Sequence, residues 1–413
     1  MSTAVVRRLD RPTLALVAIA IAAGYGQFGA VASLEEVAHH FGHTSATANF
    51  SGVVGLSGSV LSVGLAILRL SALFALPMTS LADRWGRKKV LRRVTIAGLV
   101  LTAIAAGSPS YWAFVAFFAL ARPLLSAAQT LVGVLTVELS SPSVRVYRLA
   151  CVAAGAGVGA GLSAILHGVL PGANAFRWLF ASAFIPALAV QPLLKLVREP
   201  GAVERDPSST PARLGSIPKD YRRVMVIVAT VTVVIGIITG PANGFAFVYG
   251  EGVLKISRHV VALVVLMSAL TGLAGLFVGR WCADALGRRW TVALGTIATA
   301  VTSTVAYSGG RSSFIVGYMI GVFAAAFLAP AASALVNELF PHVARATAAG
   351  WVVVAGVVGA VVGLLIFGVA GDVTHTTVTV NSLRVPALVT FLPALPALYL
   401  LRLLPETRGT TID

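Results

Sequence analysis

Apolar stretches of about 20 residues recur along the whole of this 413-residue chain. A helix of that length crosses the hydrocarbon core of a membrane, which is about 30 Å thick. With 57% hydrophobic and 11% charged residues, the chain cannot cover its outside with polar groups as a water-soluble protein does. The sequence therefore predicts an all-α membrane protein of about twelve transmembrane helices. The expected spans are 13–35, 52–81, 94–109, 112–138, 147–170, 177–197, 224–248, 259–281, 291–309, 313–338, 347–370 and 385–404.

The second apolar tract is too long for one ordinary span. It runs from Thr44 to Leu81, whereas about 20 residues are enough to cross the hydrocarbon core. We therefore expect an extended or kinked helix in this part of the chain.

The positive charge of the chain is distributed unevenly between the two predicted sides. A net charge of +16 would suit a protein that binds nucleic acid. With the N-terminus inside, however, the cytoplasmic segments hold 24 Lys and Arg and the outer segments five. Such a bias orients a membrane protein. The sequence thus predicts a multi-pass protein of the plasma (inner) membrane, in contact with the lipid bilayer, with both termini cytoplasmic and no nucleic acid as partner.

Two copies of one unit follow each other in the sequence. Residues 81–88 after the second span and 282–289 after the eighth share Ala-Asp-x-x-Gly-Arg and a basic residue, 201 positions apart. A Glu and an Arg seven residues apart follow both the fourth and the tenth span. The repeat predicts an N-terminal six-helix half at 1–197 and a C-terminal half at 222–413. Residues 198–221 between them, rich in Pro, Ser and charges, are the expected cytoplasmic linker.

Taken together, these motifs resemble the major facilitator superfamily of secondary transporters. The resemblance rests on six plus six spans, the loop at 82–88 and its second copy, and Pro-Glu-Thr-Arg-Gly at 405–409. It implies two six-helix bundles related by pseudo-symmetry. The Glu-Leu-x-x-Pro element at 138–142 favours the sugar-porter and metabolite–proton symporter branches. The sequence departs from the family pattern where Thr79 and Arg280 replace the Gly that opens the loop motif.

The repeated loop motif is the candidate for a conformational latch. The loop resembles one that acts as a latch in the superfamily. Its contacts close the cytoplasmic side of the transporter in one state and break in the other. A carboxylate at a helix C-terminus is also a poor electrostatic match and needs a partner elsewhere. The alternative is that these charges only set topology and anchor helix ends. The predicted latch residues are Asp83, Arg87, Glu138, Arg145, Asp284, Arg288, Glu338 and Arg345.

Two arginines lie well inside predicted spans. Arg69 and Arg122 lie 14 and 16 residues before Asp83 and Glu138 respectively. An Arg at the bilayer centre costs at least ~2.5–3.5 kcal/mol on insertion scales, so it should face a cavity or a partner. One interpretation is that they bind an anionic substrate group through their guanidinium groups. The other is that each bonds backbone carbonyls or extends toward a water-filled cleft.

Two amides are further candidates for substrate binding. Gly24-Tyr25-Gly26-Gln27 in the first span and Gly240-Pro241-Ala242-Asn243 in the seventh share a Gly-x-x-amide pattern. Gly and Pro there could interrupt each helix, as at transporter binding sites, although a simple kink explains Pro241 nearly as well. Gln27 and Asn243 are the predicted cavity residues.

Acidic residues and histidines gather at the outer ends of the spans. We expect those near the first span, and His167 and Glu251, to form a solvated rim, although the histidine spacing would also permit metal binding. No Asp or Glu lies mid-span, so a coupling proton would need Asp83, an outer Glu or the substrate itself. The residues near the first span are Glu35, Glu36, His39, His40 and His43.

The sequence favours a secondary transporter that moves a small solute by alternating access, with an anionic metabolite and proton coupling as the leading case. A proton-antiporting efflux pump is the alternative, although the Gly-Pro motif of drug–proton antiporters is absent from the fifth span. A membrane-embedded enzyme and a transport-dead sensor are the other classes. No phosphate-binding Gly-x-x-x-x-Gly-Lys-Ser/Thr loop is present. We expect no enzymatic activity, no cofactor, no metal and function as a monomer.

Overall fold

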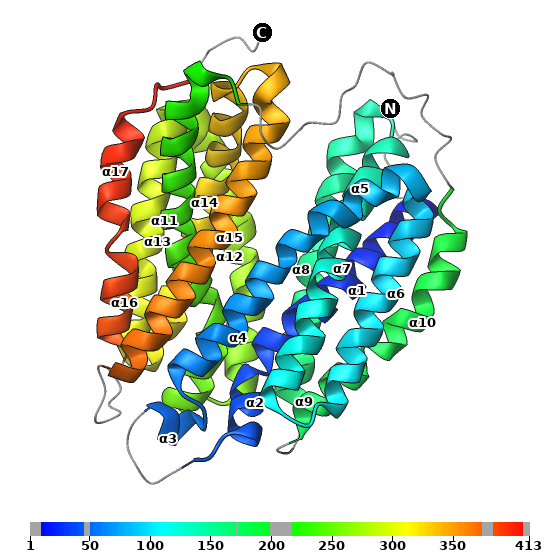
Figure 1. Ribbon diagram of the computed structural model, residues 1–413, viewed down its shortest axis with the longest axis vertical. Helices are drawn as coiled ribbons and strands as arrows, with labels where there is room; N and C mark the ends of the chain where they lie inside the picture. The colour runs from blue at the N-terminus through cyan, green and yellow to red at the C-terminus, as the bar shows by residue number, and fades with distance from the viewer. Residues whose placement is uncertain are drawn as a thin grey trace, which may run out of the picture. The chain divides into compact units, whose positions relative to one another are not determined.

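The computed structural model describes residues 10–44, 50–170, 172, 174–198, 217–373 and 383–407. All regular secondary structure in these ranges is helical (Figure 1), which confirms the predicted all-α fold. Eleven segments of the described chain are long and apolar enough to cross a membrane. The predicted span at 291–309 corresponds to α13 (Arg288–Ser308), which falls outside that set.

Helix α13 carries seven Ser and Thr residues. Five of its Thr hydroxyls donate to the carbonyl one turn earlier, for example Thr296 to Val292 at 2.8 Å and Thr299 to Gly295 at 2.7 Å. These bonds satisfy the hydroxyls inside the helix, so the polar sequence is compatible with a position in the membrane.

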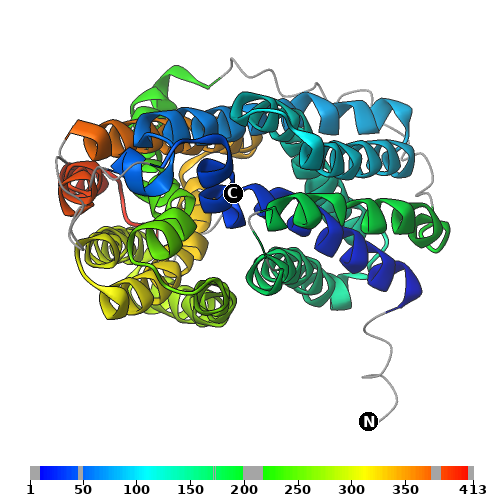
Figure 2. The same ribbon diagram turned by 90° about the horizontal axis from the view of Figure 1, so that it is seen from below.

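The chain divides into two compact units, and Figure 2 views the helices of each from one end. The first consists of residues 1–41 and 71–206, and the second of residues 42–70 and 207–413. The first unit contains α1 (Arg11–Ala32), α2 (Leu34–Phe41), η1 (Ala72–Phe74), α5 (Ala75–Trp85), α6 (Arg87–Ile104), η2 (Ala105–Gly107), α7 (Tyr111–Glu138), α8 (Pro142–Val169), α9 (Ala175–Ala181) and α10 (Phe184–Lys195).

The second unit contains the C-terminal helices and the outer part of the second span. Its elements are α3 (Phe50–Val54), α4 (Gly58–Ser71), η3 (Lys219–Tyr221), α11 (Arg222–Gly244), the π-helix η4 (Val248–Val253), α12 (Arg258–Leu286), α13, α14 (Arg311–Leu339), α15 (His342–Val373), α16 (Arg384–Phe391) and α17 (Ala394–Arg402). The predicted halves at 1–197 and 222–413 and the linker at 198–221 stay a prediction. Most of that linker lies outside the described residues.

The long second tract is divided into segments, as the sequence predicts. The short helix α3 ends before Gly55, whose φ of 97° turns the chain. Helix α4 then passes through the 3₁₀ turn η1 into α5. Pro77 lies in the first turn of α5, where its missing N–H removes the hydrogen bond to the carbonyl four residues earlier. The prediction of an extended or kinked helix is therefore confirmed.

Equivalent helix pairs of the two units pack closely through glycine. A Cβ atom at Gly159 of α8 would lie 2.0 Å from the carbonyl oxygen of Ile21 in α1. A Cβ atom at Gly359 of α15 would lie 2.1 Å from the carbonyl oxygen of Val233 in α11. The backbones can approach this closely only because no side chain intervenes.

All six tryptophans lie at the surface of their unit, with 42–69% of each residue exposed. In a water-soluble protein such large apolar side chains would be mostly buried. Many Leu, Ile, Val and Phe side chains in the helices are exposed as well. Tryptophan is enriched where a membrane protein meets the two interfaces of the bilayer. The surface therefore suits lipid rather than water.

The contact of Gly159 with α1 predicts a stability difference between two neighbouring glycines. Gly159→Ala forces a methyl group against the Ile21 carbonyl, and overpacking of this kind costs about 1–3 kcal/mol. A Cβ atom at Gly157 meets nothing within 4 Å, so Gly157→Ala is the matched control. We expect a lower melting temperature in detergent for Gly159→Ala only. Equal melting temperatures for the two variants would contradict the close packing.

Candidate functional site

A cavity of about 340 Å³ lies within the second unit, among α11, α13 and α14. Its wall carries hydroxyl and amide groups and no charged side chain. Thirteen residues line it: Thr239, Ala242, Asn243, Thr299, Ser303, Ala306, Tyr307, Gly317, Tyr318, Gly321, Val322, Ala325 and Ala326. A cavity of this size and polarity suits a small polar solute or one part of it.

The geometry of α11 explains why polar groups gather at this cavity. The helix continues through Pro241 and ends at Gly244, so its last carbonyls lack partners within the helix. The hydroxyl of the buried Tyr307 donates to the carbonyl of Ala242 at 2.9 Å and to that of Pro241 at 3.3 Å. Asn243 Nδ2 donates to the Thr239 carbonyl at 2.9 Å, which leaves the amide oxygen of Asn243 to accept a bond from a ligand.

Asn243 is the predicted substrate residue that lines this cavity. Arg69 lies half-buried in α4 of the same unit and is not among the lining residues. Gln27 in α1 and Arg122 in α7 belong to the first unit and are partly buried. Neither α1 nor α11 is interrupted at its Gly-x-x-amide pattern. The substrate-binding role of all four residues stays a prediction.

Gln27 and Arg122 lie at a similar depth of the first unit. A Cβ atom at Gly26 would lie 2.8 Å from Leu125 of α7, which brings the residue before Gln27 to the helical turn that contains Arg122. Nε2 of Gln27 is buried and has no hydrogen-bond partner among the described residues. An amide in that position can donate to a ligand.

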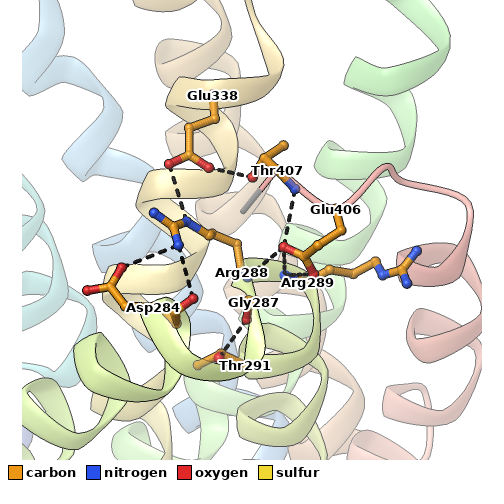
Figure 3. A network of polar contacts seen from close by, with 9 residues as sticks. Asp284, Gly287, Arg288, Arg289, Thr291, Glu338, Glu406 and Thr407 are labelled. Carbon is orange, nitrogen blue, oxygen red and sulfur yellow. Dashed lines mark hydrogen bonds and ion pairs between the residues drawn. The ribbon is translucent and has the colours of Figure 1, made fainter. Parts of the chain in front are cut away.

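The second copy of the loop motif forms a network of polar contacts (Figure 3). Arg288 Nε lies 3.3 Å from Glu338 Oε1, and Arg288 Nη1 lies 3.3 Å from Asp284 Oδ1. Arg288 Nη1 also donates to the carbonyl of Ala283 at 3.1 Å. These contacts join the end of α12, the start of α13 and the end of α14, so three of the four predicted second-half residues lie together.

Glu406 completes this network, although it is not among the eight predicted latch residues. Its Oε1 accepts a bond from the backbone N–H of Arg288 at 2.7 Å, and its Oε2 accepts one from Arg289 at 3.2 Å (Figure 3). A carboxylate is favourable at a helix N-terminus, where N–H groups lack partners. Thr407 donates to the other oxygen of Glu338. The sequence feature that points to Glu406 is the Pro-Glu-Thr element at 405–407.

The first copy of the motif shows the equivalent central ion pair. Arg87 at the start of α6 pairs with Glu138 at the end of α7. The side chain of Asp83 lies outside the described part of the structure. Among the side chains that are described, no ion pair joins Arg145 or Arg345 to a carboxylate. All the ion pairs of the motif described here lie inside one unit, and the latch role stays a prediction.

The expectation of a solvated rim is wrong for three residues. Glu36 in α2 and His167 in α8 have side chains only 1% and 0% exposed, with Glu36 Oε2 3.8 Å from His167 Nδ1. Glu251 is buried in η4, with its Oε2 4.0 Å from Arg258 Nε. The reason is that α2 and η4 are packed against other helices. His39 and His40 are exposed, as a rim requires.

The structure assembles no metal site from these outer residues. Within the described ranges, no group of three or more His, Cys, Asp or Glu side chains is placed to hold a metal ion. His40 Nε2 instead lies 3.2 Å from Arg177 Nη2, and burial together with the charge of Arg177 lowers the pKa of His40.

A second helix N-terminus is capped by a carboxylate that the sequence analysis did not single out. Asp372 near the end of α15 accepts bonds from the backbone N–H groups of Gly58 at 2.7 Å and Ser59 at 2.8 Å. These are the first residues of α4, so the negative side chain faces the positive end of the helix. The contact joins the outer part of the second span to α15 within the second unit.

Repeated helical units, closely packed helix pairs and a polar cavity among lipid-facing helices define a membrane transport protein. The sequence matches the model of the Major Facilitator Superfamily over residues 14–257 and 238–412. The chain therefore belongs to this superfamily, as the loop motifs predict. No curated protein matches the sequence.

Solved structures of low sequence identity share the fold. A bacterial homolog of the human lysosomal transporter Spinster has a TM-score of 0.76 at 13% identity, over 95% of this chain and 96% of its own. A mutant of the nucleoside transporter NupG has a TM-score of 0.76 at 13% identity, over 95% and 99%. A D-xylose–proton symporter has a TM-score of 0.71 at 18% identity, over 97% and 99%. At these identities the likeness shows the fold alone.

The cap at Asp372 predicts a stability effect that depends on charge. Asp372→Asn removes a negative charge from the N-terminus of α4, where it contributes about 0.3–1 kcal/mol. We expect a lower melting temperature for the purified protein. Asp220→Asn is the control, because Asp220 is also close to a helix start, in the 3₁₀ turn before α11, but is exposed and, within the described part of the chain, has no hydrogen bond to the N–H groups of that helix. If both variants have the melting temperature of the wild type, the contact of Asp372 with the start of α4 does not stabilise the protein.

Proposed function

We propose that this chain is a secondary active transporter that moves a small solute across the plasma membrane by alternating access. The repeated halves, the superfamily match and the polar cavity in the second unit support this proposal. The 24-to-five distribution of Lys and Arg supports cytoplasmic termini. The superfamily consists of transporters, so a membrane-embedded enzyme is disfavoured.

The cavity with Asn243 is the observation that carries the substrate proposal. Its lining offers the hydroxyls of Thr239, Thr299 and Ser303 and the amide of Asn243, and no charge. Such a wall suits the uncharged, hydroxyl-bearing part of a solute. Arg122 in the first unit is proposed separately as a partner for an anionic group of a solute, because a guanidinium binds carboxylate or phosphate through two donors. The favoured substrate class is therefore a small anionic metabolite.

Glu36 and His167 are the proposed carriers of the coupling proton. Both titratable side chains are almost fully buried, and Glu36 Oε2 lies 3.8 Å from His167 Nδ1. Ionisable groups inside a membrane protein mark substrate or ion pathways and proton relays. The other titratable or charged groups described on α2 and on the neighbouring α9 are Glu35, His39, His40 and Arg177.

Alternating access requires the two units to move relative to each other. Such movement would affect the second span, because its residues are divided between the units. Helix α4 is tied to α15 by Asp372, whereas α5, which continues from it, belongs to the first unit. Such movement would either bend the chain at η1 or break the contact of Asp372. The 3₁₀ turn η1 and Pro77 lower the cost of bending there.

Transport by purified protein in liposomes tests the proposal. We would screen small organic anions with and without a pH gradient, in both directions. Uptake driven by inward proton movement supports the symport case, whereas expulsion driven by the same gradient supports the efflux alternative. A folded protein that moves none of the compounds in either direction would favour a transport-dead sensor.

The role of Arg122 predicts a difference between two substitutions. Arg122→Lys keeps the charge and loses the planar pair of donors, so it should weaken substrate binding moderately. Arg122→Ala should weaken it more, because the anion then enters a low-dielectric site without a counter-ion. Binding and melting temperature are measured on the same purified variants. Unchanged affinity in a stable Arg122→Ala protein would exclude the anion site.

The buried pair predicts a specific loss of proton coupling. Glu36→Gln keeps the shape of the side chain and removes its titration, so accumulation driven by a pH gradient should be lost while exchange of substrate across the liposome membrane continues. Glu35→Gln on the same helix is the matched control. Gradient-driven accumulation that survives in Glu36→Gln would show that the proton is carried elsewhere.

A further inference from the structure

A second cleft, of about 270 Å³, lies in the first unit between the start of α6 and the end of α10. These two helix ends are about 100 residues apart in the sequence, and the helices lie side by side (Figure 1). The lining residues are Lys88, Lys89, Arg92, Gln191, Leu194 and Lys195. We call this the basic cleft.

The basic cleft concentrates positive charge in an unfavourable way. Three of its four cations lie in the first turns of α6, where the helix N-terminus is itself positive and no acidic residue is present. Lys88 and Arg92 are four residues apart on this helix, a spacing at which like charges repel. Lys88 Nζ donates to the Val197 carbonyl at 2.6 Å, but no carboxylate is among the lining residues. A bound anion would relieve this repulsion.

The second copy of the repeat shows that the fold does not require the charges of Lys89 and Arg92. At the 201-residue offset, Lys89 corresponds to Trp290 and Arg92 to Ala293. The N-terminus of α13 is capped instead by Glu406. The corresponding acid in the first copy, Glu199, lies outside the described residues, and one carboxylate would still leave the four cations in excess. Orientation in the membrane requires positive residues on one side, but it does not require them to converge on a cleft.

The surroundings of the basic cleft indicate where its anion comes from. On α10, Ile185 and Leu188 are 71% and 63% exposed, and Leu196 just beyond the helix is 46% exposed. This apolar face suits lipid chains, and the cleft lies at its end, beside the exposed Trp85 that ends α5. Basic pockets between transmembrane helices on the cytoplasmic side of a membrane bind the headgroups of anionic lipids.

We propose that the basic cleft binds the phosphate group of an anionic phospholipid of the cytoplasmic leaflet. Lys89, Arg92 and Lys195 surround the phosphate, and the acyl chains extend along the exposed face of α10. The choice of leaflet rests on the proposed orientation, but the binding does not depend on transport activity.

Lipid binding by purified protein tests this proposal directly. Protein in a neutral detergent is titrated with phosphatidylglycerol, with phosphatidylcholine or with inorganic phosphate, and bound lipid is counted by native mass spectrometry. The test variant is Arg92→Gln with Lys195→Gln. The matched control is Arg93→Gln with Arg198→Gln, which removes two exposed cations from α6 and from the segment after α10 that do not line the cleft.

We expect the wild type and the control to bind phosphatidylglycerol and the test variant to bind it about 30-fold more weakly, at ~1 kcal/mol for each charge removed. Phosphatidylcholine should bind equally weakly to all three proteins, and their melting temperatures without lipid should agree. Equal phosphatidylglycerol affinity in the test variant overturns the proposal. Tight binding of inorganic phosphate without any preference for phosphatidylglycerol overturns the lipid as the source. Neither result depends on whether the protein transports a solute.

Discussion

Polar groups in the hydrocarbon core must find their partners inside the protein, because lipid offers none. The helices satisfy the main chain, and the Thr hydroxyls of α13 bond back to it. Helix ends remain, and three of them receive a side chain from a distant segment: Asp372 at the start of α4, Glu406 at the start of α13, and Tyr307 at the end of α11. The contact of Tyr307 lies at the cavity, and that of Glu406 lies in the loop network.

The two units share a scaffold but differ in chemistry. The close glycine contacts and the Arg–Glu pairs occur at equivalent positions in both. The uncharged cavity lies in the second unit, whereas Arg122 and the buried pair of Glu36 and His167 lie in the first. The sequence repeat explains the glycine contacts and Arg–Glu pairs that the two units share. The differences then indicate where each half acquired its own role, and they are the positions on which the functional proposals rest.

The sequence was sufficient for the fold because span length and repeated motifs are local signals. The pairing of Arg288 with Glu338 also followed from the repeat, since both residues lie at helix ends. Burial of Glu36 could not be predicted. On α2, Leu34, Val37 and Ala38 form an apolar stripe, and Glu36 lies on the opposite face at 100° per residue. That face would be solvated on an isolated helix, but His167 of α8 covers it here. Helix caps from distant residues escaped prediction for the same reason.

The ion pairs of the loop motif also bear on how such a chain can move. The pairs of Arg87 with Glu138 and of Arg288 with Glu338 each lie inside one unit. They can therefore persist while the units move. The second span is different, because α4 and α5 belong to different units and are joined by η1. Any rocking motion must be absorbed there or at Asp372.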